Sequence, residues 1–119
     1  EGDVMSRITD ELSKYGCDMN TTLERFLGDE DFYEKCLIEM LDDSSFRKLG
    51  EALEQKNVKA AFESAHALKG LAANMGLDSM LDIVVELVEP LRNGMIDGLS
   101  PTYERLIAEK KTYDNIVNG

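Results

Sequence analysis

Apolar residues recur every three or four positions along most of the chain, the spacing of one face of an α-helix. The first stripe runs over 3–15 and ends at Gly16, a residue that favours helix termination. A short second segment follows, for which Thr21 or Thr22 could serve as N-cap. Its apolar positions are Leu23, Phe26 and Leu27.

Two further helices are predicted before the middle of the chain. The first begins at Asp29, where an acidic first turn suits a helix N-terminus. Its buried stripe is expected to comprise Phe32, Cys36, Leu37, Met40 and Leu41. The second begins at the pair Ser44-Ser45 and turns inward Phe46, Leu49 and Leu53.

The second half of the chain predicts three longer helices. Asn57 is a good N-cap for a helix that runs to Met75 and is ended by Gly76. The inner stripe of this helix comprises Val58, Ala61, Phe62, Ala65, Leu68, Ala72 and Met75. A stripe over 77–91 follows, in which Pro90 should kink or end the last turns. Ser100 as N-cap and Pro101 as first helical residue open a final helix with Tyr103, Leu106, Ile107, Tyr113 and Ile116.

The fold class follows from these stripes. No segment alternates apolar and polar residues as a strand does, and both Asn93-Gly94 and Asp97-Gly98 fall in one interhelical loop. We therefore expect an all-α fold, an antiparallel four-helix bundle with additional short helices on the N-terminal side. At 119 residues, the chain suits a single domain spanning 1–119.

Charge narrows the classes of partner. Asp and Glu total 24 against 13 Lys and Arg, a net charge of −11 that repels nucleic-acid phosphates and anionic lipid. No run reaches the roughly 20 apolar residues of a membrane span, and the first residues lack the order of a signal peptide. We expect a cytoplasmic protein, and a monomer because its charge opposes self-association.

Cysteine and histidine usage gives no basis for a metal site. Cys17 and Cys36 are expected to be buried, reduced thiols, with a disulfide as the minor alternative. One histidine and two separated cysteines do not supply the ligands of a zinc centre. We therefore expect no metal ligands in this chain.

The only histidine, His66, lies in the segment SAHALKGLAANMGL over 64–77. At 100° per residue it points about 120° away from the apolar stripe of its helix, so it should face water. Lys69 and Gly70 follow at i+3 and i+4 and flank it on the same surface. A lone surface histidine without any role is the alternative.

Each neighbour of His66 has a physical meaning. The stem of Lys69 can lie on the bundle while its ammonium reaches above the ring, where it could hold an anion. Glycine inside a helix costs about 1 kcal/mol relative to alanine, so Gly70 suggests close approach by a partner. Small residues nearby, Ala67, Ala73 and Asn74, leave a low surface for a second protein.

An imidazole of ordinary pKa, about 6.5, is a nucleophile at cellular pH and can form a covalent phosphoryl intermediate. A cation beside it would stabilise the transferred charge. The chain has neither a P-loop nor a kinase glycine loop. A phosphoryl group would therefore come from another protein and leave to another protein.

The pattern Ala65-His66, Lys69-Gly70 and Gly76 resembles that of the histidine phosphotransfer (HPt) family, with weaker similarity from Gly16 to Gly94. The resemblance implies a phosphocarrier rather than an enzyme, in which His66 accepts a phosphoryl group from a receiver-domain aspartate and passes it to another receiver. Lys69 would steady the phosphoryl oxygens. Its partners would be response-regulator receiver domains and a hybrid sensor histidine kinase, with Mg²⁺ supplied by the receiver.

Two positions depart from that family. Many members place a glutamine 22 residues after the histidine, where this chain has Val88. Either another polar group, such as Glu63, could orient the imidazole, or solvent could set its tautomer. Asn57 stands where an aspartate is common, and since both residues cap helices we expect no functional consequence.

Three hypotheses follow. The first is a phosphorelay intermediate that docks receivers through Ala67, Gly70, Leu71 and Asn74. The second, motivated by Val88, is a binding module of the same fold that performs no transfer. The third is an unrelated acidic helical adaptor in which His66 is incidental. No set of acid, base and nucleophile suggests an enzyme acting on small molecules.

Overall fold

The computed structural model describes residues 6–119, which fold into helices joined by short loops. The elements are α1 (Arg7–Lys14), α2 (Met19–Glu24), α3 (Glu30–Leu41), α4 (Ser45–Glu54), α5 (Val58–Met75), α6 (Asp78–Arg92) and α7 (Ser100–Asn118). This range holds no strand, so the predicted all-α class is confirmed. The predicted start of the first helix at Asp3 lies outside the described residues.

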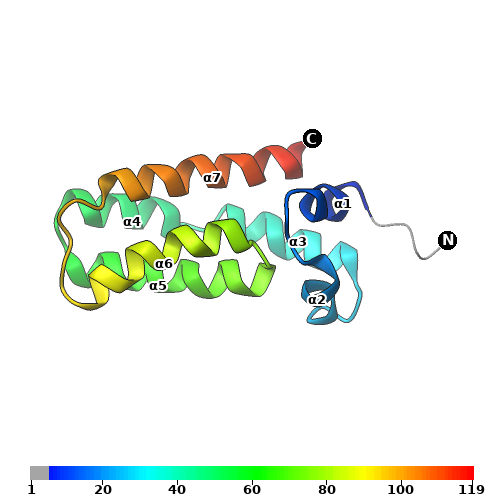
Figure 1. The fold of residues 1–119 in the computed structure, drawn as a ribbon, viewed down its shortest axis with the longest axis horizontal. Coiled ribbons are helices and arrows are strands. Elements are labelled where there is room, and N and C mark those ends of the chain that lie inside the picture. Colours follow the sequence, from blue (N-terminus) through cyan, green and yellow to red (C-terminus); the bar gives the residue numbers. More distant parts are fainter. Residues whose placement is uncertain (1–5) are drawn as a thin grey trace.

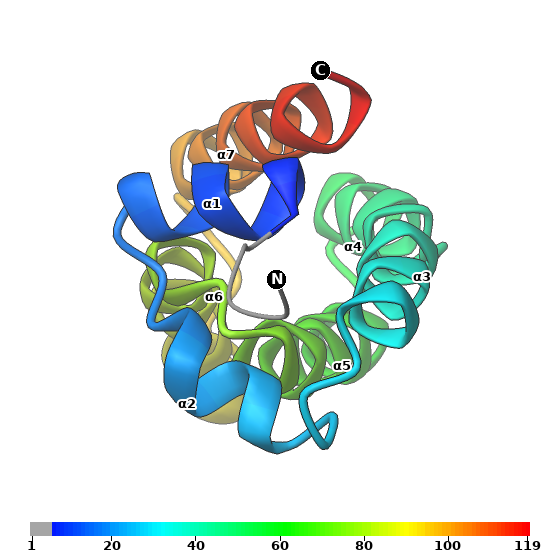
Figure 2. The ribbon, with the colours of Figure 1, turned by 90° about the vertical axis from the view of Figure 1, so that its right-hand side faces the viewer.

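The helices form an elongated four-sided bundle (Figure 1). Seen along the bundle in Figure 2, α5, α6 and α7 form three sides, while α3 and α4 follow one another along the fourth. The short helices α1 and α2 lie across one end. The predicted four-helix bundle with short N-terminal helices is therefore confirmed, with one side built from two consecutive helices.

The turn between α3 and α4 contains a side chain that caps α4. After α3 ends at Leu41, the carboxylate of Asp43 accepts a hydrogen bond of 2.8 Å from the Ser45 backbone N–H. Ser44, the predicted starting residue, occupies the N-cap position of α4 but makes no side-chain cap bond. Asp43 therefore satisfies a backbone N–H group at the start of α4 that has no partner within the helix.

The core is most closely packed where α5 lies between α4 and α6. The inner face of α5 is rich in alanine, which allows its backbone to approach its neighbours closely. Ala61, Ala65, Leu68 and Ala72 are fully buried there, as are Val84, Leu87 and Val88 of α6. This packing leaves the opposite face of α5 outside the bundle.

Some of the predicted N-cap residues are confirmed, and those predicted for α2 are wrong. Asp29 and Asn57 cap α3 and α5 as predicted. The N-cap of α2 is Asp18, rather than Thr21 or Thr22, and it accepts the Thr21 N–H at 3.1 Å.

The last two helices differ slightly from their predicted ends. Ser100 is the first residue of α7 rather than its cap, with Pro101 in its first turn. Pro90 lies in the last turn of α6, which ends two residues later at Arg92.

Several apolar positions differ from the predicted stripes, among them Ile107 of α7, which is 37% exposed. In α3 the buried aromatic residue is Tyr33, fully inaccessible, whereas Phe32 is 53% exposed. The reason is that the Tyr33 hydroxyl donates to the Met75 carbonyl oxygen at 2.7 Å, so its polar atom is satisfied inside the core. Leu27, expected to be an apolar contact, is 94% exposed after the end of α2. Cys36 is only partly buried.

Polar contacts attach α1 to the bundle. The Ser6 backbone N–H and the Thr9 hydroxyl donate to Glu30 of α3 at 2.9 and 2.7 Å. These bonds hold the pKa of the Glu30 carboxyl below its usual value. The Arg7 guanidinium donates to two carbonyl oxygens at the end of α7, those of Ile116 and Val117.

Both cysteines are free thiols. Cys17 is buried, as predicted, and burial raises the pKa of its thiol. In the described part of the chain, no helix is long and apolar enough to cross a membrane.

The end of α5 generates a stability prediction. Gly76 adopts φ +74°, and an added Cβ would collide with the Thr22 hydroxyl of α2. Gly76→Ala should therefore lower the free energy of unfolding by about 2–4 kcal/mol, from left-handed strain and overpacking together. Urea denaturation measures this loss.

Gly28→Ala is the matched control. Gly28 has a similar φ of +77°, but its Cβ would meet no atom within 4 Å. Only the backbone cost of about 1–2 kcal/mol should then appear. Equal losses in the two variants would contradict the predicted collision between α2 and α5.

Candidate functional site

Helix α5 carries His66 on its outward face. The helix begins where Asn57 accepts the Ala60 N–H at 3.1 Å and ends at the left-handed Gly76. His66 is exposed, while its neighbour Ala65 is fully buried, as their angular positions predict. The imidazole thus projects from a helix whose other side is fixed in the core.

The C-terminal end of α5 is held by two side chains from other helices. The Arg25 guanidinium, next to α2, donates to the carbonyl oxygens of Ala73 and Asn74, in each case at 3.0 Å. The Tyr33 hydroxyl satisfies the next carbonyl, that of Met75. Burial raises the pKa of Tyr33, so this group stays a donor. Because helix-end carbonyls otherwise lack partners, these bonds fix the last turn of α5.

Within residues 6–119, no side chain donates a hydrogen bond to His66 or accepts one from it. Glu63, suggested as an orienting group, makes no bond to the ring, so that suggestion is wrong. Val88 is fully buried in α6 and offers no polar atom. The ring instead lies against Phe62, one turn earlier, with centroids 5.5 Å apart and planes inclined by 16°.

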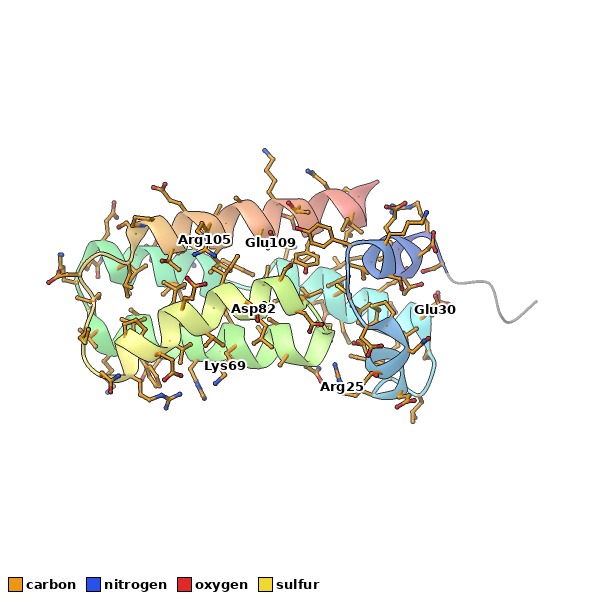
Figure 3. The ribbon with its side chains drawn as sticks, viewed as in Figure 1. Arg25, Glu30, Lys69, Asp82, Arg105 and Glu109 are labelled. Atoms are coloured by element: carbon orange, nitrogen blue, oxygen red, sulfur yellow. The ribbon has the colours of Figure 1, made fainter. Side chains whose placement is uncertain are left out.

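Lys69 lies beside the histidine and is partly exposed. Among the described residues it forms no ion pair or hydrogen bond, so its ammonium is available to an anion. Figure 3 shows Lys69 on the lower side of the bundle, with Arg25 near the end of the same helix. Helix α5 has one carboxylate, Glu63, against Lys59 and Lys69, although acidic residues predominate in the whole chain.

The four predicted docking residues lie along α5 and its flank. Ala67, Gly70 and Asn74 are exposed, whereas Leu71 is partly buried against the core. A Cβ added to Gly70 would meet no atom within 4 Å, so no contact inside the protein requires glycine there. Together these residues leave a low surface beside His66.

Three recesses on the surface of the described residues lie away from His66. These recesses, between α4 and α7, α1 and α7, and α4 and α5, include neither His66 nor Lys69 in their walls. Nor does the described region contain a group of three or more His, Cys, Asp or Glu side chains that could hold a metal ion. What the site offers is a nucleophile, a nearby cation and an open surface.

Sequence reasoning missed three residues of this region. The apolar pattern predicts only that Phe62 belongs to the buried stripe. Its spacing of four residues from His66 is the signal that the two side chains can contact each other. Arg92 of α6 lies over the Phe62 ring, 5.3 Å from its centroid. Arg25 reaches α5 from a segment 48 residues earlier. No local pattern indicates the last two contacts.

Comparisons with known proteins agree with this geometry. The sequence model of the Hpt domain family matches residues 31–113. The chain is similar to a solved structure, histidine-containing phosphotransfer protein B (HptB) from Pseudomonas aeruginosa PAO1. The two sequences are 25% identical, and the two structures have a TM-score of 0.76. The match covers 86% of this chain and 90% of that chain. No curated protein matches significantly.

The open space at Gly70 generates a second prediction. Gly70→Ala should raise the free energy of unfolding by about 0.5–1 kcal/mol, because alanine favours the helix and its Cβ meets nothing. Gly50→Ala in α4 is the control, since its Cβ would lie 2.5 Å from the Tyr103 hydroxyl oxygen. Urea denaturation should show a gain for the first variant only. A loss at Gly70 would indicate an internal role for this glycine.

Proposed function

This chain belongs to the Hpt domain family of phosphorelay proteins, and on that premise we propose that His66 accepts a phosphoryl group from the aspartate of one receiver domain and passes it to another. The observation that carries this proposal is the free imidazole of His66 on the outward face of a fixed helix. As in the family at large, the chain acts as a phosphocarrier.

The proposed step conserves atoms and charge. The unprotonated ring nitrogen of His66 attacks phosphorus, and an N–P bond forms as the bond from phosphorus to the aspartyl oxygen breaks. The electron pair of the broken bond returns to the aspartate carboxylate. The second transfer is the reverse step, made to the carboxylate of a different receiver.

Lys69 supports this step by its charge. Its free ammonium, one turn after His66, would stabilise the phosphoryl oxygens during transfer. The Mg²⁺ ion would come with the receiver, whose carboxylates would hold it. The described residues of this chain supply no comparable group of ligands.

We propose that receivers dock over Ala67, Gly70, Leu71 and Asn74. The missing side chain of Gly70 leaves space for a receiver loop above the imidazole. The donors and acceptors would be response-regulator receiver domains and a hybrid sensor histidine kinase. In this role the chain would work as a cytoplasmic monomer.

One observation favours a second candidate function. Val88 provides no hydrogen bond to the imidazole, so a module that binds receivers without accepting phosphoryl groups is the alternative. It predicts receiver binding by the native chain with no transfer. The third hypothesis, an unrelated adaptor, is wrong because the chain belongs to the Hpt family.

The test of the proposal is a transfer assay. A receiver domain carrying labelled aspartyl phosphate is mixed with the native chain and with His66→Gln. The native chain should gain acid-labile, alkali-stable label, whereas His66→Gln should gain none, because glutamine has no nucleophilic ring nitrogen. Receiver binding measured by calorimetry should persist in the variant. Equal labelling of the two proteins would disprove transfer through His66.

Lys69→Met generates a separate kinetic prediction. Methionine keeps an unbranched stem but removes the charge, so the first-order transfer rate should fall by about ten- to a hundredfold. Lys59→Met is the matched control, because Lys59 lies on the same face of α5 as His66 but about 10 Å from it along the helix axis. Rapid-quench kinetics at saturating receiver measures both. Equal slowing would mean that only the overall charge of α5 matters.

A further inference from the structure

Among the described residues, the imidazole of His66 has one aromatic neighbour, the ring of Phe62. The two rings are nearly parallel, at 16°, with centroids 5.5 Å apart. The contact follows from helix geometry, because side chains lean toward the N-terminus and residues four apart lie one above the other. A ring in this position limits rotation of the imidazole about its own side-chain bond.

Phe62 is itself held on more than one side. It is partly buried and packs against the hydrophobic core. The Arg92 guanidinium carbon lies 5.3 Å from the centroid of its ring, at the last residue of α6. Arg92 is in turn 3.9 Å from the Glu89 carboxylate. Phe62 therefore links the imidazole to the core and to the end of the neighbouring helix.

Hydrogen bonds provide no competing constraint on the ring. Neither Glu63 nor any other described side chain bonds to His66, and Val88 is apolar and fully buried. Both nitrogens of an imidazole lie in the ring plane. Whatever fixes that plane therefore fixes the direction of the lone pair that attacks phosphorus.

From this geometry we infer that Phe62 is a positioning residue for phosphoryl transfer. Its ring holds the plane of the His66 imidazole, and Arg92 acts through it by holding the Phe62 ring. This inference rests on the proposed function of His66. With the plane fixed, the attacking nitrogen meets phosphorus in line with the breaking bond to the aspartyl oxygen, and less rotational freedom is lost in the reaction.

The stack can be tested without any partner, because His66 is the only histidine in the chain. Its ring protons therefore give the only histidine signals in an NMR spectrum. In the native chain they should be shifted upfield by the Phe62 ring current, and Phe62→Leu should abolish that shift. Leucine keeps the apolar contact with the core but has no aromatic face. Phe32→Leu in α3 is the matched control and should leave the signals in place.

Kinetics tests whether the stack matters for transfer. At saturating phosphorylated receiver, Phe62→Leu should lower the first-order transfer rate by about two- to tenfold, the range expected for losing one aromatic pair. The receiver concentration at half-maximal rate should stay unchanged. Arg92→Met should show a smaller decrease, whereas Arg105→Met in α7, where the arginine pairs with Glu86, should show none.

Two results would overturn the inference. Loss of the ring-current shift with an unchanged transfer rate would show that orientation by Phe62 is irrelevant. A change confined to the half-saturating receiver concentration would make Phe62 a docking residue instead.

A small donor separates this inference from the proposed function. Phosphoramidate can phosphorylate an imidazole as its P–N bond breaks and ammonia leaves, with no receiver present. Phosphoramidate diffuses freely and can approach the ring from any direction, so Phe62→Leu should be labelled by it at the native rate if Phe62 acts by aligning the ring with a docked receiver. Native chain labelled by phosphoramidate but not by receivers would overturn the proposed function alone. Phosphoramidate labelling that is slowed in Phe62→Leu as much as transfer from a receiver would overturn the inference alone, because Phe62 would then act on the reactivity of the ring nitrogen and not on its alignment.

Discussion

The burial of one face of α5 is the constraint on which the rest of the structure depends. Alanines at 61, 65 and 72 bring the helix close to α4 and α6, so it cannot rotate without opening the core. Arg25 and Tyr33 satisfy its last carbonyl oxygens and hold its end in place. The outward position of His66 follows from this packing, because residues on one helix keep fixed angles to each other.

The outward face of α5 carries energetic costs that no contact among the described residues offsets. Gly70 weakens the helix where an alanine side chain would have free space. Within residues 6–119 Lys69 has no carboxylate partner, although acidic residues greatly outnumber basic ones in the sequence. In both cases the local preference of the sequence is overridden without an internal gain. Such departures are expected at functional sites, where the compensating interaction is made with a partner.

Local spacing predicted the helices, the caps at Asp29 and Asn57, and the exposure of His66, because each depends on residues within a few turns. The burial of Tyr33 in place of Phe32 could not be predicted in this way. Burying tyrosine requires an acceptor for its hydroxyl, and that acceptor lies 42 residues away on Met75. The contacts of Arg25 and Arg92 likewise depend on how helices are aligned with one another, which one helical stripe does not specify.

Orientation by stacking has a consequence for a carrier that must both accept and donate. A hydrogen bond to the imidazole would fix its plane by engaging one nitrogen and would favour one protonation state. Contact with the ring face can fix the plane without engaging either nitrogen, and no side chain among residues 6–119 forms a hydrogen bond to the ring. The geometry of Phe62 and His66 is therefore compatible with attack on phosphorus in one encounter and release in the next, without a bond inside the protein to break.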